Sequence, residues 1–106
     1  MGDLKPFRDE IDALDEQLID LLSRRFAVVR KVGELKAREG LDVVQSARAE
    51  EVLSRVASMA ESKNLDPELM RKIWAMMIDQ AHVIERQIKE QANNKESGHD
   101  RTGTDD

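Results

Sequence analysis

A heptad pattern in the first third of the chain limits what this sequence can fold into. Apolar side chains recur at alternating spacings of four and three residues, interrupted once by Arg25. The apolar positions are Phe7, Ile11, Leu14, Leu18, Leu21, Val28, Val32 and Leu35. This spacing predicts a helix over residues 5–38, about 50 Å long, with a seam on one face. Such a helix extends beyond the core that 106 residues can build, so it needs a partner, most simply a second copy of itself.

Two further helices follow the first one. Gly40 is suited to the left-handed end of the first helix, and Ser46 to the N-cap of a second helix that ends near Ser62. Asp66 and Pro67 indicate the N-cap and first position of a third helix, which we expect to end near Gln91. No stretch has the alternating pattern of a β-strand, so the predicted fold class is all-α: a three-helix protomer with a long first helix.

The last fourteen residues differ in composition from the rest of the chain. Residues 93–106 contain no apolar side chain and include two glycines. A segment that cannot bury apolar surface gains little from folding. We therefore predict one helical domain over residues 1–92 and a polar disordered tail over residues 93–106.

The composition excludes several classes of function. The chain has no cysteine, which excludes disulfides and thiolate chemistry, and its two histidines are too few for a convincing metal site. A net charge of −5 argues against a nucleic-acid partner. No signal peptide and no apolar run of membrane-spanning length is present, so we expect no membrane partner and a cytoplasmic location.

Two cations occupy positions that are costly for a charge. Arg25 lies on the apolar seam, where a guanidinium must be paired or must face a ligand. Lys36 follows eleven residues later, within about 20° of the same helix face and about 16 Å along the axis. The alternatives are that Arg25 reaches solvent or pairs with a core carboxylate, and that Lys36 is an ordinary lysine near a helix end.

The second and third helices carry one further charge each on an apolar face. Arg48 shares the face of Val52, or else pairs with Glu51 three residues later. Glu85 falls within the apolar stripe of the third helix, where a carboxyl must be paired or protonated; its alternative is an ion pair with Lys89.

Arg8 is too far from Arg25 to share a pocket with it in one chain. It lies seventeen residues earlier, about 25 Å along the same helix. In an antiparallel dimer of the long helix, Arg8 of one chain approaches Arg25 and Lys36 of the other; the alternative is a surface arginine beside Asp12. Together these charges predict a cavity with several cations and one carboxyl. Such a cavity suits a small dianion and catalysis by positioning and electrostatics.

Taken as one pattern, these residues resemble the all-helical class of chorismate mutase. The resemblance spans residues 4–90 and rests on Arg8-x-x-Ile11-x-x-Leu14-Asp15, Leu18-x-x-Leu21-Leu22-x-x-Arg25, Val32-Gly33-x-x-Lys36 and Arg48. It implies an intertwined homodimeric helical bundle with two active sites, each completed by Arg8 of the partner chain. It also implies an enzyme of the shikimate pathway and aromatic amino acid biosynthesis, which rearranges chorismate to prephenate without a cofactor.

The resemblance further implies a role for each site residue. Arg8, Arg25 and Arg48 would bind the two carboxylates of the substrate. Lys36 would donate to the ether oxygen, where negative charge develops as the C–O bond breaks, and Glu85 would be the second donor to it. Family members often carry glutamine at the position of Glu85. Because an ionised carboxylate would repel that charge, Glu85 is expected to act protonated.

Three positions depart from the family pattern around the substrate ring. The residue after Arg48 is commonly a glutamate that accepts from the ring hydroxyl, and here it is Ala49. Gln45 replaces an acidic loop residue, and Ala81 stands where a serine is expected. These changes leave the isochorismate-pyruvate lyases, which share the fold and the cationic residues, as one alternative. A mutase of 4-amino-4-deoxychorismate is another.

A function without catalysis is the remaining alternative. A helical dimerisation or regulatory module would account for the seam and for the three helices. It does not account for Arg25, because leucine at a buried seam position would stabilise a simple dimer at lower cost. The sequence therefore favours the enzyme.

Overall fold

The computed structural model describes the backbone of residues 2–105 and the side chains of residues 2–94. This part of the chain forms three α-helices and no strand: α1 (Lys5–Glu39), α2 (Ser46–Ser62) and α3 (Pro67–Asp105). The predicted all-α class is confirmed. Within the same residues, no helix is long and apolar enough to cross a membrane.

The end of α1 turns the chain sharply beside Lys36. Gly40 adopts a left-handed conformation with φ 66° and ψ 30°, which costs a glycine little because it has no Cβ. The amides of Gly40 and Leu41 both donate to the carbonyl oxygen of Lys36, the latter at 2.9 Å. The chain therefore leaves α1 one turn after Lys36 and folds back over it as the loop of residues 40–45.

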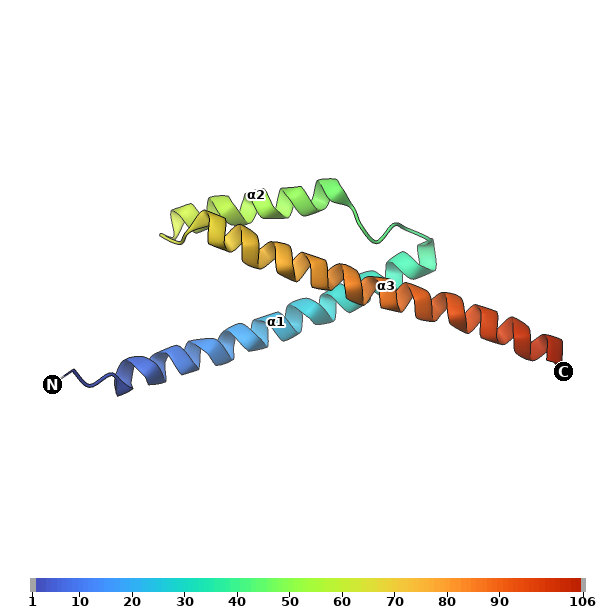
Figure 1. Ribbon diagram of the computed structural model, residues 1–106, viewed down its shortest axis with the longest axis horizontal. Helices are drawn as coiled ribbons and strands as arrows, with labels where there is room; N and C mark the ends of the chain where they lie inside the picture. The colour runs from blue at the N-terminus through green and yellow to red at the C-terminus, as the bar shows by residue number, and fades with distance from the viewer. Residues whose placement is uncertain (1, 106) are drawn as a thin grey trace.

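Helices α2 and α3 form an antiparallel hairpin (Figure 1). Val52, Val56 and Ala60 are the buried side chains of α2, at the spacing of a helix face that packs on a neighbour. Asp66 caps α3 as predicted, because its Oδ1 accepts from the amides of Glu68 at 3.0 Å and Leu69 at 3.4 Å. The hairpin places α3 between α2 and α1, so that α1 packs on α3.

The start of α2 differs from the prediction by one position. Gln45, with φ −120° and ψ 91°, is the N-cap residue, and Ser46 is the first residue of the helix. The side chain of Gln45 does not cap α2; its Nε2 donates to the carbonyl oxygen of Asp42 at 3.4 Å. The extended backbone of Gln45 therefore joins the loop to α2, and Ser46 is the first helical residue instead of the cap.

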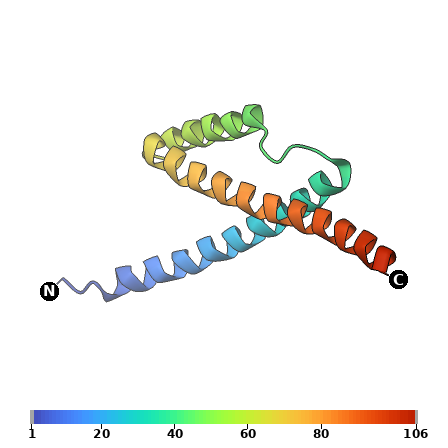
Figure 2. The same cartoon turned by 45° about the vertical axis from the view of Figure 1, so that its right-hand side comes forward.

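Helix α1 packs on α3 alone and crosses it in a single region. In the described part of the chain no Cα atom of α1 lies within 8 Å of one in α2, and Figures 1 and 2 show the first half of α1 extending away from the hairpin. The molecule is accordingly elongated, with dimensions of 77 × 32 × 15 Å. Gly33 is the buried residue of α1, at the crossing.

The seam of α1 is exposed in this single chain. Phe7, Ile11, Leu14 and Leu18 are between 50% and 64% exposed. A row of large apolar side chains in water is the feature expected of a surface that a partner covers. No second chain is present, so the predicted dimer stays a prediction here.

The third helix is longer than the sequence predicts. Its backbone continues through residues 93–105 and ends at Asp105 instead of near Gln91. The segment contains no proline, the residue that forbids helical backbone geometry most strongly, so its polar composition alone did not fix an end. The disorder of residues 93–106 stays a prediction. The side chains of residues 95–106 lie outside the described residues, and the domain boundary after residue 92 stays a prediction.

Candidate active site

A cavity of about 440 Å³ lies where α1 crosses the hairpin. Its wall comes from all three helices and from the loop of residues 40–45. The structure brings seven of the eight predicted site residues to this wall: Arg25, Lys36, Gln45, Arg48, Ala49, Ala81 and Glu85. The roles that the sequence assigns to them stay predictions.

Lys36 and Glu85 form a buried ion pair in the wall of the cavity. Nζ of Lys36 lies 2.5 Å from Oε1 of Glu85, and the two side chains are 14% and 6% exposed. The same ammonium donates to the carbonyl oxygen of Val43 at 2.7 Å. Glu85 is thus paired with a cation of α1 and not with Lys89, the alternative on its own helix. A buried carboxylate is tolerated here because a cation compensates for its lost hydration.

Gly33 explains how α1 comes close enough for this pair. A Cβ atom at Gly33 would lie 3.2 Å from Cα and 3.3 Å from Cγ of Glu85. Lys36 is three residues further along α1, on the same face of the helix. The missing side chain therefore sets the helix separation that lets Lys36 reach Glu85.

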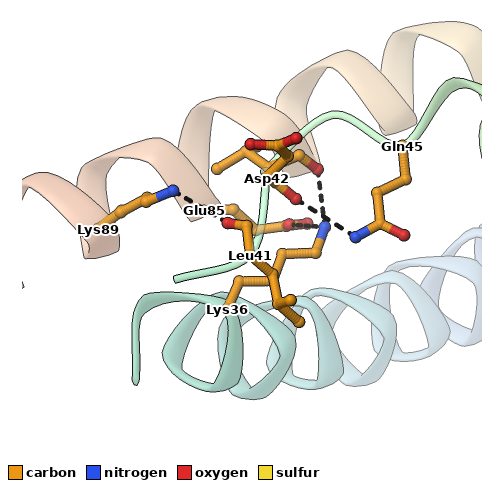
Figure 3. A network of polar contacts seen from close by, with 7 residues as sticks. Lys36, Leu41, Asp42, Gln45, Glu85 and Lys89 are labelled. Carbon is orange, nitrogen blue, oxygen red and sulfur yellow. Dashed lines mark hydrogen bonds and ion pairs between the residues drawn. The ribbon is translucent and has the colours of Figure 1, made fainter. Parts of the chain in front are cut away.

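Two lysines hold the loop of residues 40–45 over the cavity (Figure 3). Lys36 bonds the carbonyl of Val43, and Nζ of Lys89 on α3 donates to the carbonyl oxygen of Leu41 at 2.9 Å. Val43 is buried, whereas Gln45 is exposed at the rim. The first half of the loop is therefore held at two carbonyls by side chains from different helices.

The arginines of the wall differ in their surroundings. Arg25 is half-buried on α1. Arg48 is exposed, and its Nη1 lies 2.8 Å from Oε1 of Glu51, the pairing that the sequence offered as the alternative. Exposed ion pairs of this kind contribute about 0–1 kcal/mol, so a charged ligand can draw Arg48 away from Glu51 at little cost.

Arg8 lies apart from the other predicted residues. It is exposed near the start of α1 and does not line the cavity of its own chain. This agrees with the helix geometry, because about 25 Å of helix separates it from Arg25. Any role for Arg8 in a site requires a second copy of the chain.

The sequence prediction missed two polar residues of the wall, Arg55 and His82. Arg55 follows Arg48 by seven residues, two turns along the same face of α2, so the spacing was a usable signal. His82 precedes Glu85 by three residues on α3 and is half-buried. Neither interrupts an apolar seam, and for that reason neither stood out in the sequence.

The charges of the wall favour an anionic ligand. Arg25, Arg48 and Arg55 carry positive charge, while Lys36 and Glu85 compensate one another. Such a set can bind two carboxylates and place an ammonium beside a third oxygen. Apolar side chains, among them Val32, Val52 and Ile78, complete the wall and can enclose a hydrocarbon ring.

The comparisons with known proteins agree with this geometry. Residues 7–87 match the family described as chorismate mutase type II, and the chain belongs to that family. It is 31% identical over 85 residues to the T-protein of Enterobacter agglomerans, covering 80% of this chain and 23% of that protein. It is 24% identical over 92 residues to the chorismate mutase of Methanocaldococcus jannaschii, covering 87% and 93% of the two chains.

A third relative carries a different name. The chain is 29% identical over 84 residues to the 4-amino-4-deoxychorismate mutase of Streptomyces venezuelae, covering 79% of this chain and 82% of that protein. The chain thus spans about a quarter of the T-protein and most of the two shorter relatives. Membership of the family does not by itself select the substrate.

Proposed function

We propose that the chain is a chorismate mutase, which converts chorismate to prephenate by a cofactor-free Claisen rearrangement. The observation that carries this proposal is the buried Lys36–Glu85 pair within a wall that otherwise holds arginines. A reaction that moves only electrons within one dianion needs clamps for two carboxylates and donors at one oxygen. The cavity offers both.

The arginines supply the clamp. Arg25 and Arg48 approach the cavity from α1 and α2, so they bind carboxylates from two sides. Holding both carboxylates keeps the flexible substrate in the chair-like form in which the new C–C bond can form. This is catalysis by restriction of conformation, which lowers the entropic part of the barrier.

The Lys36–Glu85 pair supplies the donors. As the C–O bond of the substrate breaks, negative charge grows on the ether oxygen, and a fixed ammonium beside it stabilises the transition state more than the ground state. For Glu85 to donate as well, it must carry a proton. Binding of the substrate therefore replaces the direct bond between Lys36 and Glu85 with bonds from both groups to the ether oxygen.

The site requires a dimer to be complete. The exposed seam of α1 gives a second copy a surface to cover, with Leu14 and Leu18 near its middle. An antiparallel arrangement of the two α1 helices brings Arg8 of one chain to the open side of the partner cavity, near Arg25. Arg8 then becomes the third arginine that binds the substrate carboxylates.

One alternative activity is the same rearrangement of 4-amino-4-deoxychorismate. One relative is named a 4-amino-4-deoxychorismate mutase. In this chain, however, no carboxylate stands at the three positions expected near the ring substituent, which are Gln45, Ala49 and Ala81. An amino group that carries positive charge would meet arginines and no carboxylate on this side of the cavity. The hydroxyl-bearing substrate is therefore the better fit, and an isochorismate-pyruvate lyase is the other alternative.

The test is identification of products from purified wild-type chain incubated separately with chorismate, isochorismate and 4-amino-4-deoxychorismate. The proposal expects prephenate from chorismate, at a higher catalytic efficiency than turnover of either other compound. Pyruvate and salicylate from isochorismate, with little prephenate, would identify a lyase. Arg25→Ala is the matched control: it should remove turnover and leave a folded protein. If no compound is consumed, the non-catalytic module becomes the better interpretation.

A further inference from the structure

The cavity wall contains few groups that can accept a hydrogen bond. Its arginines and Lys36 are donors only. The acceptors among its side chains are Gln45, His82 and Glu85. These donors can bind the carboxylates of a ligand. A hydroxyl on the ring of the ligand also has a hydrogen to donate, and that hydrogen bond needs an acceptor in the wall.

Two of these three acceptors are poorly suited to that hydroxyl. Glu85 is bonded to Lys36, beside which the ether oxygen is expected. Gln45 is exposed at the rim, where water competes for its carbonyl. His82 is half-buried and lines the cavity from α3.

The register of the hairpin places His82 at nearly the same level as Ala49 on the neighbouring helix. Ala49 is 13 residues before Ser62, the last residue of α2, and His82 is 15 residues after Pro67, the first residue of α3. In an antiparallel pair this puts the two residues within about 3 Å of one level along the helices. Ala81, next to His82, is buried, and both alanines leave room for a ligand between α2 and α3.

We propose that His82 is a specificity-determining residue that accepts a hydrogen bond from the hydroxyl on the substrate ring. This inference rests on the proposed function, because it takes the ligand to be a hydroxylated cyclohexadiene dicarboxylate. A neutral imidazole has one unprotonated nitrogen and accepts one such bond. The ring then lies between Ala49 and His82, with its ether oxygen toward Lys36.

Kinetics of variants with two substrates test the inference. The full chain is compared with His82→Leu, which removes the acceptor, with His82→Gln, which retains one, and with Gln80→Leu on the exposed side of α3. Each is assayed with chorismate and with a chorismate analogue that lacks the ring hydroxyl. Circular dichroism establishes that each variant is folded; if His82→Leu is not, His82→Ala, which also removes the acceptor, replaces it.

The expected result is a loss that depends on the hydroxyl. His82→Leu should lower kcat/KM for chorismate about three- to tenfold, the usual worth of one neutral hydrogen bond, and leave the analogue nearly unaffected. His82→Gln should lose less, and Gln80→Leu should match the wild type. Equal losses with both substrates, or no loss with chorismate, would overturn the role of His82 while the mutase activity stands. A wild-type chain that consumes no chorismate would overturn both proposals.

Discussion

A Cβ atom at Gly33 would lie 3.2 Å from the Cα atom of Glu85. The backbones of α1 and α3 thus approach one another where the family motif has its glycine, one turn before Lys36. The ion pair between Lys36 and Glu85 depends on this approach, because the lysine has to reach the carboxylate across the crossing.

Gly33→Val is expected to weaken both the fold and the site. The added side chain meets the backbone of Glu85 and the Cδ1 atom of Ile88 at 3.0 Å, so the helices must separate. Overpacking of this kind costs about 1–3 kcal/mol of unfolding free energy. Denaturant unfolding at fixed protein concentration measures it. Glu34→Val, an exposed neighbour, is the control for the helix propensity of valine; equal losses in the two variants would contradict a close crossing.

Glu85→Gln is expected to raise kcat for chorismate. Glu85 pairs with Lys36 as a carboxylate, and a negative charge beside the ether oxygen opposes the charge that develops there. Glutamine has nearly the same shape and always donates, so the gain should be about three- to tenfold, the worth of one neutral hydrogen bond. Steady-state kinetics of the two folded proteins measure it, and an unchanged kcat would remove the cost assigned to the carboxylate.

Mixing two inactive variants is expected to restore activity. Arg8→Ala and Arg25→Ala damage different halves of a shared site, so a hybrid dimer contains one intact site. Random exchange of subunits should give about a quarter of the wild-type rate. A mixture of Arg25→Ala with Lys36→Ala, both on one side of the site, is the control and should stay inactive. Absence of restoration in the first mixture, with subunit exchange shown independently, would argue against the shared site.

Lys89→Met is expected to raise KM for chorismate more than it lowers kcat. Lys89 touches the loop and not the cavity, and its bond to the carbonyl of Leu41 is 2.9 Å long. Loss of this bond should cost about three- to tenfold in kcat/KM, because the loop that carries Gln45 is less well placed. Lys89→Arg keeps a donor and should stay near the wild type. If both variants lose equally, the loop is held by other contacts.

Much of the fold could be predicted from the sequence because local signals set the helix bounds. The seam spacing, with Pro6 and Gly40, indicated α1 to within one residue, and Asp66 with Pro67 indicated the start of α3. The end of α3 was wrong for a physical reason. A polar composition shows that a segment has little to pack against, but by itself it does not forbid helical backbone geometry as a proline would.

The sequence predicted which residues line the site better than it predicted which of them pair with one another. Arg25 and Glu85 stood out because each breaks an apolar pattern, and such a break is visible in a sequence. The partner of Glu85 was not visible, since Lys36 lies 49 positions earlier and the pairing depends on how α1 crosses α3. Arg55 could have been found from its seven-residue spacing to Arg48, whereas His82 sits at an ordinary helical position and only the assembled cavity reveals it.

The most direct test of the account is the rate of prephenate formation from chorismate by Glu85→Gln with and without Lys36→Met. The Glu85→Gln background avoids leaving an unpaired buried carboxylate when the lysine is removed. The account predicts that Glu85→Gln forms prephenate and that adding Lys36→Met slows it by about a hundredfold or more in a folded protein. Equal rates for Glu85→Gln with and without Lys36→Met would contradict the account. It would also be contradicted if neither Glu85→Gln nor the wild type formed prephenate.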